Sequence, residues 1–383
     1  MPESPRPLRD GSIDSLTRAL GVSRIARVTG LDRTGVEVAS AIRPRGHVLA
    51  VSNGKGRTFA AATAGALHEA AELWAAERPV SLVSGTPAEV RARFGAAAVL
   101  APEELEPGAF APEARVAWCT AGELATGARV LVPAAAVFCP PPGTPSLGPA
   151  NVRWTSNGLG ASRDRARAVA HALCEVVERD WLARALPDGF TEGASARRLV
   201  DRATLPRAVT ALVSDLEGRR FRVHFLDLDP GLDPGAGADR AAAGPHAAPG
   251  PAAFAAVLVD PDGGPVPVAA GYACRLDAAA ALEAALLEAA QSRATEIHGA
   301  REDVAAGDRH AGAPLADLLA RARPAVRVRP RRGPHGAREA LSLLVAAASR
   351  GGTSPVACVD LAGPAELHVV KIVAPGLLLS ELL

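Results

Sequence analysis

The sequence predicts a mixed α/β fold of the α+β kind, with long helices and antiparallel or mixed sheets. Apolar, strand-like runs alternate with helical stretches along the chain, and a hairpin signal, Asp-Gly-Gly at 262–264, separates two of the runs. Three long helical stretches also share one acidic signature. Interleaved strands and helices with hairpins favour this class over an all-parallel sheet. With 383 residues, the chain can bury a large core as one elaborate domain or as two or three.

Along the first half of the chain, capping and periodicity predict a short helix, two strands, a long helix and an irregular stretch. Ser12 is a suitable N-cap for the short helix, apolar runs mark the strands, and Pro79 ends the long helix. Within the irregular stretch, short strands alternate with Pro-rich turns. The ranges, in that order, are 12–20, 24–31, 47–56, 58–77 and 80–150.

The second half predicts two more long helices, further shorter ones, and several strands. Apolar residues at helical spacing predict the helices, and the Asp-Gly-Gly turn predicts a hairpin. Residues 230–252 are rich in Pro, Gly and Ala without periodicity, which predicts a flexible insertion. The remaining ranges are 162–185, 201–218, 277–298 and 336–349 for helices, 222–228, 355–361 and 367–373 for strands, and 253–273 for the hairpin.

Charge and hydropathy argue against nucleic-acid and membrane partners. The formal net charge of +1 gives no global field for either. The basic run 325–338 lies among prolines without aromatic residues, which favours a solvated loop. No apolar run reaches the roughly 18 residues of a membrane-spanning helix, and the first residues lack the apolar core of a signal peptide. We expect a cytoplasmic protein.

The three long helices share the pattern Ala-Leu-x-Glu-x-x-Glu/Gln. Residues three apart lie on one face of a helix, and carboxylates on helices this apolar are costly to bury without a partner. One such pair is usually a solvated surface feature. Three copies that converge would form a cage of hard oxygen ligands, suited to Mg²⁺ and to a phosphate bridged through it. The copies are 66-ALHEAAEL-73, 172-ALCEVVER-179 and 285-ALLEAAQSR-293.

Cationic residues accompany the carboxylates. Arg179 follows the second copy directly, Arg293 lies within the third, and Lys55 lies in a Gly-flanked turn before the first helix. Magnesium together with Arg and Lys is suited to stabilising a transferring phosphoryl group. The sequence contains neither a GxxxxGK[ST] P-loop nor the protein-kinase signatures, so a nucleotide site would need another design.

With these motifs the sequence resembles the YcaO family, ATP-dependent enzymes that activate backbone amides of peptides. The resemblance covers nearly the whole chain and implies a single YcaO domain over 1–383, including the insertion at 230–252. It also implies an ATP site without a P-loop, in which carboxylates on several helices hold Mg²⁺. The matching stretches are 27-RVTGLDRTGVEV-38, 52-SNGKGRTFAAATAGALHEAAE-72, 156-SNGLGASRDRARAVAHALCEVVERDW-181, 282-LEAALLEAAQSRATEIHGARED-303 and 370-VKIVAPGL-377.

The family's functional residues can be carried over position by position. Arg179 and Arg293 are expected to act in catalysis by neutralising phosphate, with Lys55 as a further cation. Residues 62–65 and 165–168 depart from the family pattern, and Arg9 lies near the position of a basic residue in the family. The expected metal ligands are Glu69, Glu72, Glu175, Glu178 and Glu288. The expected nucleotide contacts are these five together with Ser15, Lys55, Arg179, Gln291 and Arg293.

The resemblance implies two possible products. A nucleophile adds to the amide, and the resulting oxyanion takes the γ-phosphoryl group of ATP before phosphate departs. A Cys, Ser or Thr side chain of the substrate would give an azoline, whereas external sulfide would give a thioamide. The tail 375-PGLLLSELL-383 lacks the Pro alternation common in azoline-forming relatives, and the motif segments look most like relatives encoded with a TfuA partner. This favours thioamide formation.

The expected partners are a precursor peptide and a TfuA-like or other protein that delivers sulfide or the leader peptide. The chain begins close to its family-like core, which suggests that a partner supplies leader recognition, and we expect a homodimer. Three alternatives stay open: a catalytically idle scaffold for a partner, a Mg²⁺-dependent nucleotide enzyme unrelated to peptides, and acidic helices that are merely solvated surfaces.

Overall fold

The computed structural model of the chain has the mixed α/β architecture that the sequence predicts. It describes residues 10–100, 102–105, 113–144, 146–149, 154–232, 250–299, 312–329, 331, 334–349, 355–364 and 366–379. Arg9, most of the predicted insertion and the last four residues lie outside the described residues.

The strands form three sheets in which all paired strands run antiparallel. The first sheet has the order β1-β2-β3, with β1 Arg24–Arg27, β2 Glu37–Ile42 and β3 Val51–Gly56. The second has the order β10-β9-β8, with β8 Arg222–Asp227, β9 Ala252–Val259 and β10 Val268–Arg275. The largest has the order β4-β5-β11-β12-β7, with β6 paired to β5. Its strands are β4 Val83–Gly85, β5 Val116–Glu123, β6 Arg129–Pro133, β7 Leu159–Ser162, β11 Ala357–Leu361 and β12 His368–Val373.

Three long helices each follow an edge strand and pack back onto the sheet that contains it. They are α2 Phe59–Ala76 after β3, α5 Arg165–Ala185 after β7, and α8 Ala278–His298 after β10. Shorter helices lie around them. These are α1 Asp10–Leu20, α3 Pro87–Phe94, α4 Pro102–Leu105, α6 Glu192–Arg198, α7 Arg207–Gly218, α9 Gly312–Arg321 and α10 Ala337–Ala348.

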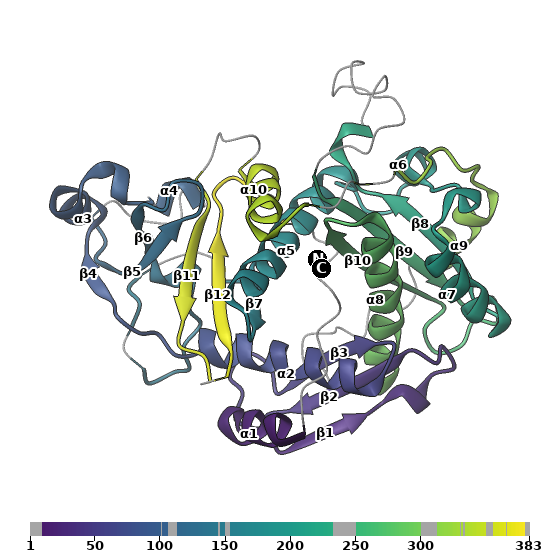
Figure 1. The fold of residues 1–383 in the computed structure, drawn as a ribbon, viewed down its shortest axis with the longest axis horizontal. Helices are drawn as coiled ribbons and strands as arrows, with labels where there is room; N and C mark the ends of the chain where they lie inside the picture. Colours follow the sequence, from purple (N-terminus) through teal and green to yellow (C-terminus); the bar gives the residue numbers. More distant parts are fainter. Residues whose placement is uncertain are drawn as a thin grey trace.

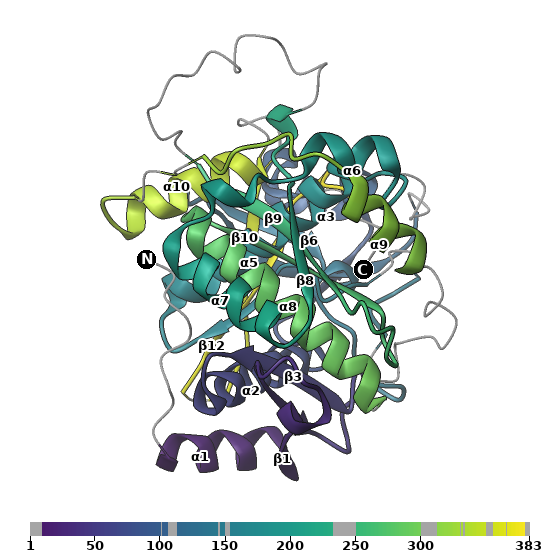
Figure 2. The same cartoon turned by 90° about the vertical axis from the view of Figure 1, so that its right-hand side faces the viewer.

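The three strand–helix units are arranged cyclically. Besides its own sheet, α2 contacts β7, α5 contacts β10, and α8 contacts β3, so each helix touches the edge strand of the next unit. In Figure 1 the helices lie around the middle of the view, with the largest sheet to the left and the β8–β10 sheet to the right. Turned by 90°, α1, α2 and the β1–β3 sheet lie together at the bottom (Figure 2). This arrangement directs one face of each long helix toward the other two.

Glycines allow the close approach of strand to helix in all three units, with Gly271 on β10 in the third. A Cβ added at Gly54 would lie 2.0 Å from the carbonyl oxygen of Ala62 on α2. A Cβ at Gly160 would lie 2.4 Å from the carbonyl oxygen of Ala168 on α5. Backbone atoms cannot yield at such distances, so both positions require glycine. The buried alanines opposite them complete the tight packing.

The structure corrects several predicted boundaries. Lys55 lies within β3 and not in a turn, and 47–50 precedes that strand. The helix predicted at 201–218 begins only at Arg207, because Pro206 occupies the N-cap position and restricts the residue before it. Strand β2 was not predicted, since its small residues give a weak periodic signal. Among the described helices, none combines the length and apolarity needed to cross a bilayer.

Candidate active site

The three long helices present their acidic pairs at the same depth. Each helix begins at a capping side chain that accepts a hydrogen bond from the N–H group three residues further on. The first glutamate of each pair lies eleven residues after the cap, which is about three helical turns. The caps are Thr58, Asp164 and Asp277, and the pairs are Glu69/Glu72, Glu175/Glu178 and Glu288/Gln291. Equal spacing on cyclically packed helices brings the carboxylates together.

Each junction between units also supplies one hydrogen bond to a glutamate of the neighbouring helix. The donor is always the residue three positions before the next N-cap, at the end of the edge strand. Two donors are backbone N–H groups, and the third is a lysine side chain. The bonds run from Ala161 N to Glu72 Oε1 (2.8 Å), from Cys274 N to Glu178 Oε2 (3.0 Å) and from Lys55 Nζ to Glu288 Oε2 (2.6 Å). The cyclic packing of the fold therefore fixes the orientation of the acidic cluster.

Enclosure and mutual repulsion make the cluster electrostatically strained in the absence of a cation. Burial, with the nearby charges of Glu175 and Glu69, raises the pKa of Glu72 well above its ordinary value. Burial also raises the pKa of Glu175, and it raises the pKa of Glu178 to about 7, although Arg179 acts in the opposite direction. Carboxylates with raised pKa values hold their charge only with compensation. A cation among them would relieve this strain.

Glu288 differs from its neighbours. Burial acts to raise its pKa, but Lys55 and Arg179 outweigh this effect, and the net pKa is lowered. The Lys55 and Glu288 side chains are each 25% exposed, so solvent reaches this pair. Glu288 is therefore more readily ionised at neutral pH than Glu72, Glu175 or Glu178.

The donor set of the cluster fits Mg²⁺, because that ion prefers carboxylate oxygens and retains several of its own waters. In the described part of the chain, however, no three acidic, His or Cys side chains already converge as a ligand group. The residues that could hold the ion are the five predicted glutamates, Glu69, Glu72, Glu175, Glu178 and Glu288.

Two cations of the cluster hold contrasting positions. Arg179 lies 3.6 Å from Glu178 and 3.8 Å from Glu175 through its guanidinium nitrogens, too far for tight bonds. Lys371, which the sequence did not single out as a site residue, is buried on β12 and donates to the carbonyl oxygens of Thr155 and Asn157, both at 2.6 Å. Burial lowers the pKa of Lys371 to about 8, although Glu175 and Glu72 act to raise it. A lysine inside a strand otherwise formed of apolar residues was the available sequence signal.

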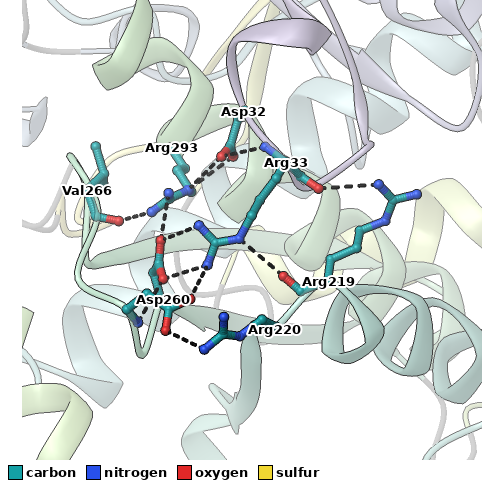
Figure 3. A network of polar contacts seen from close by, with 8 residues as sticks. Asp32, Arg33, Arg219, Arg220, Asp260, Val266 and Arg293 are labelled. Carbon is teal, nitrogen blue, oxygen red and sulfur yellow. Dashed lines mark hydrogen bonds and ion pairs between the residues drawn. The ribbon is translucent and has the colours of Figure 1, made fainter.

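Arg293 does not join the cluster. Its side chain is 2% exposed and forms ion pairs with Asp32 (3.0 Å) and Asp260 (2.9 Å) and a hydrogen bond to the carbonyl oxygen of Val266. Figure 3 shows this network, in which Arg33 also bonds both oxygens of Asp260. All three guanidinium nitrogens are engaged by these buried partners, so the geometry gives the predicted phosphate-neutralising role of Arg293 no support. The arginine points to the opposite side of α8 because it lies five residues after Glu288.

The remaining predicted residues make their printed contacts outside the cluster. Ser15 on α1 bonds Glu366, which pairs with Arg163 at 2.9 Å. Gln291 on α8 is half-buried, and its backbone carbonyl accepts a bond from the Thr295 hydroxyl. None of these contacts reaches a carboxylate of the cluster.

Two histidines complete the surroundings. His171 lies one helical turn before Glu175 and is exposed to solvent. Nearby protein and the positive charge of Arg275 lower its pKa. Burial likewise lowers the pKa of His68 to about 4, with Arg163 acting in the same direction. Both imidazoles are therefore neutral at physiological pH.

Substituting Glu178→Gln should stabilise the metal-free protein at pH 8. The folded pKa of about 7 exceeds the ordinary value of 4.5, so the folded state binds more protons than the unfolded state between these values. The contribution of Glu178 to stability therefore falls as the pH rises through this window. At pH 8 the variant should gain on the order of 3 kcal/mol, whereas near pH 4.5 the two proteins should be equal. Urea unfolding with a chelator measures both differences.

Glu288→Gln is the control of opposite sign. Its lowered pKa means that the carboxylate stabilises the folded state above the unfolded pKa, and this stability is lost as the pH falls. This variant should lose stability at pH 8. Equal shifts in the two variants would contradict the electrostatic description of the cluster.

Comparison with known proteins finds similarity to one protein family. Residues 53–378 match the family model described as YcaO cyclodehydratase, ATP- and Mg²⁺-binding. A protein of Methanothermobacter thermautotrophicus is 34% identical over 292 residues, covering 74% of this chain and 68% of that protein. A protein in the tfuA 3′ region of Rhizobium leguminosarum bv. trifolii is 31% identical over 303 residues, covering 75% of this chain and 65% of that protein.

Solved structures share the fold at lower identity. YcaO from Methanopyrus kandleri, bound with AMPPCP and Mg²⁺, is 21% identical with a TM-score of 0.69, covering 97% of this chain and 91% of that chain. A heterocyclase in complex with substrate and cofactor is 19% identical with a TM-score of 0.69. That match covers 96% of this chain, which spans about half (52%) of the heterocyclase. The predicted fold class is confirmed by these similarities, and the expectation of ATP and Mg²⁺ is confirmed at the level of the family.

Proposed function

Because the chain belongs to the YcaO family, we propose that it uses ATP to phosphorylate the oxygen of a peptide backbone amide and so converts that amide to a thioamide. The observation that carries this proposal is that the acidic pairs of α2, α5 and α8 lie near enough to interact electrostatically, beside Lys55 and Arg179. Bound Mg²⁺ would neutralise phosphate charge and orient the phosphates.

In this proposal, cationic side chains neutralise phosphate charge, and backbone hydrogen bonds hold the carboxylates in position. Lys55, held at 2.6 Å from Glu288, lies where it can meet a phosphate oxygen that approaches the cluster. Arg179 has guanidinium donors without a tight partner among its neighbouring carboxylates, so it can turn toward the transferring group. The backbone bonds to Glu72 and Glu178 keep those carboxylates in place during this change.

The proposed reaction consumes one ATP for each amide. Hydrosulfide adds to the amide carbon, and the C=O electron pair moves to oxygen. That oxygen attacks the γ-phosphorus while the bond to the β-phosphate oxygen breaks, which releases ADP. The carbon–oxygen bond then breaks, inorganic phosphate leaves, and loss of a proton completes the C=S bond. Positioning and electrostatic stabilisation are what the protein must supply for such a transfer.

The relative from the tfuA 3′ region supports thioamide formation with a TfuA-like partner, as do the motif segments of the chain. Azoline formation is the second candidate, and the cyclodehydratase description of the family favours it. A homodimer and a partner that presents the peptide remain predictions. A catalytically idle scaffold would keep the fold without ATP turnover.

Mass spectrometry of the peptide distinguishes these products. The reaction contains the full chain, a TfuA-like partner, ATP, Mg²⁺, sulfide and the candidate precursor peptide. We expect a sulfide-dependent gain in mass equal to the difference between sulfur and oxygen. Loss of one water without sulfide would establish the azoline. No change, with the partner bound, would favour the scaffold.

Thermal unfolding provides the control for the nucleotide site. A ligand that binds only the folded state raises the midpoint temperature of unfolding by mass action. ATP with Mg²⁺ should therefore raise this temperature more than ATP with a chelator does. An unchanged midpoint at millimolar nucleotide would remove the basis of the proposal.

A further inference from the structure

We infer that Arg275 binds the phosphoryl group during transfer as a second guanidinium group beside that of Arg179. It would take the role that the sequence suggested for Arg293. This inference rests on the proposed function and adds to it a residue outside the acidic motifs. Its ligand is a phosphate oxyanion: the γ-phosphoryl group of ATP and then the inorganic phosphate product.

The cyclic fold places Arg275 at a junction between two units. It directly follows Cys274, whose N–H group donates to Glu178, and it lies two residues before the N-cap of α8. The equivalent positions, two residues before the caps of α2 and α5, hold Gly56 and Ser162. At this position, two residues before the cap, only the third unit has a long cationic side chain, and it lies on the strand that contacts α5.

The guanidinium of Arg275 has unused bonding capacity. The side chain is half-buried and donates one hydrogen bond, from Nη1 to the carbonyl oxygen of Cys274 at 2.6 Å. Among the described residues, it forms no ion pair. A guanidinium carries five N–H donors in a planar fork that matches phosphate. Arg293, by contrast, has its donors engaged by two buried aspartates and a carbonyl group.

The charge of Arg275 acts within the acidic cluster. It contributes to lowering the pKa of Glu288 and acts against the raised pKa of Glu178, while it helps to keep His171 neutral. Arg179 acts on the same two carboxylates, so both guanidinium groups lie within electrostatic range of them. Neither Arg179 nor Arg275 forms a close bidentate ion pair with a carboxylate of the described residues.

An incoming phosphate would complete this arrangement. A guanidinium that is partly desolvated loses hydrogen bonds to water. Without a close anion, neighbouring groups do not replace those bonds. A phosphate oxygen supplies the charge-assisted bonds that are missing. Because the carboxylates repel phosphate, neighbouring cations must offset their charge for it to approach. Arg275 together with Lys55 and Arg179 meets that requirement, whereas Arg293 cannot leave its network without unpairing Asp32.

The test replaces Arg275→Ala and measures ATP turnover with the modified peptide as a second readout. We expect kcat to fall by about 100-fold or more, with partial recovery on adding millimolar guanidinium chloride. Arg275→Lys should retain an intermediate rate, since an ammonium supplies charge but not the fork. Arg57→Ala is the matched control. Arg57 is exposed, lies one residue before the α2 cap and pairs with half-buried Glu283, so its loss should change kcat little.

A binding measurement separates this inference from the proposed function. In the presence of ADP and Mg²⁺, the wild-type chain should bind inorganic phosphate about tenfold more tightly than Arg275→Ala, measured by calorimetry. If the wild type shows this difference but modifies no peptide, the proposed function fails and the assignment of Arg275 stands. Unchanged turnover and unchanged phosphate affinity in Arg275→Ala would overturn the assignment. So would a loss of turnover that guanidinium cannot rescue and that accompanies a lower unfolding midpoint.

Discussion

Replacing Glu69, Glu178 or Glu288 by glutamine is expected to lower ATP turnover by about 100-fold or more while the chain remains folded. The substitution keeps the size of the side chain but removes a negative charge. A hard cation prefers carboxylate to amide oxygen, so each variant should also require more Mg²⁺ for half-maximal turnover. Steady-state ATPase rates across a Mg²⁺ series measure both effects, and circular dichroism confirms folding.

Matched controls lie on the same helix and in a peripheral segment. Glu283 is on α8, five residues before Glu288, and pairs with Arg57 at the surface. Glu103 is exposed on α4 and pairs with Arg91. Glu283→Gln and Glu103→Gln should leave turnover within about a factor of two, because surface pairs contribute little. A loss in these controls as large as that in the cluster variants would show that the acidic cluster is not the active site.

The sequence predicted the helices that carry the site better than it predicted their surroundings. The repeated Ala-Leu-x-Glu pattern places a polar pair on one face of each helix whatever the tertiary fold. The convergence of the three faces was inferable only from repetition and from the family resemblance. The cyclic packing that produces it depends on contacts such as Ala161 with Glu72, which are 89 residues apart and leave no local signal.

Cationic residues were the less predictable part of the site. Arg293 is two residues after Gln291 in the motif, yet its direction depends on Asp32 and Asp260, which are distant in the sequence. Lys371 and Arg275 come from strands, where side chains alternate between two faces. Which face meets the cluster depends on how each sheet packs on its helix. Local periodicity cannot supply this information.

The role of Arg293 as a structural residue leads to the largest expected effect on stability. Arg293 joins α8 to the segment before β2 through Asp32 and to the β9–β10 connection through Asp260 and Val266 (Figure 3). The side chains of Asp32 and Asp260 are 3% and 0% exposed. Removing one partner of a buried ion pair leaves an uncompensated charge, which is more costly than losing the attraction alone.

Arg293→Met should therefore lower the free energy of unfolding by about 3–5 kcal/mol, as measured by urea denaturation at pH 7. Arg33 still bonds both oxygens of Asp260, so Asp32 is the carboxylate left without its arginine. Replacing it as well, in Asp32→Asn with Arg293→Met, should recover part of the loss because the unpaired charge is gone. Arg57→Met, which breaks a half-exposed pair with Glu283, should cost less than about 1 kcal/mol. If Arg293→Met instead kept its stability but lost ATP turnover, the arginine would have to act on phosphate, and the buried network would be incidental. A loss of stability that the second substitution partly restores identifies Arg293 as the residue that positions α8, and with it Glu288, against the rest of the cluster.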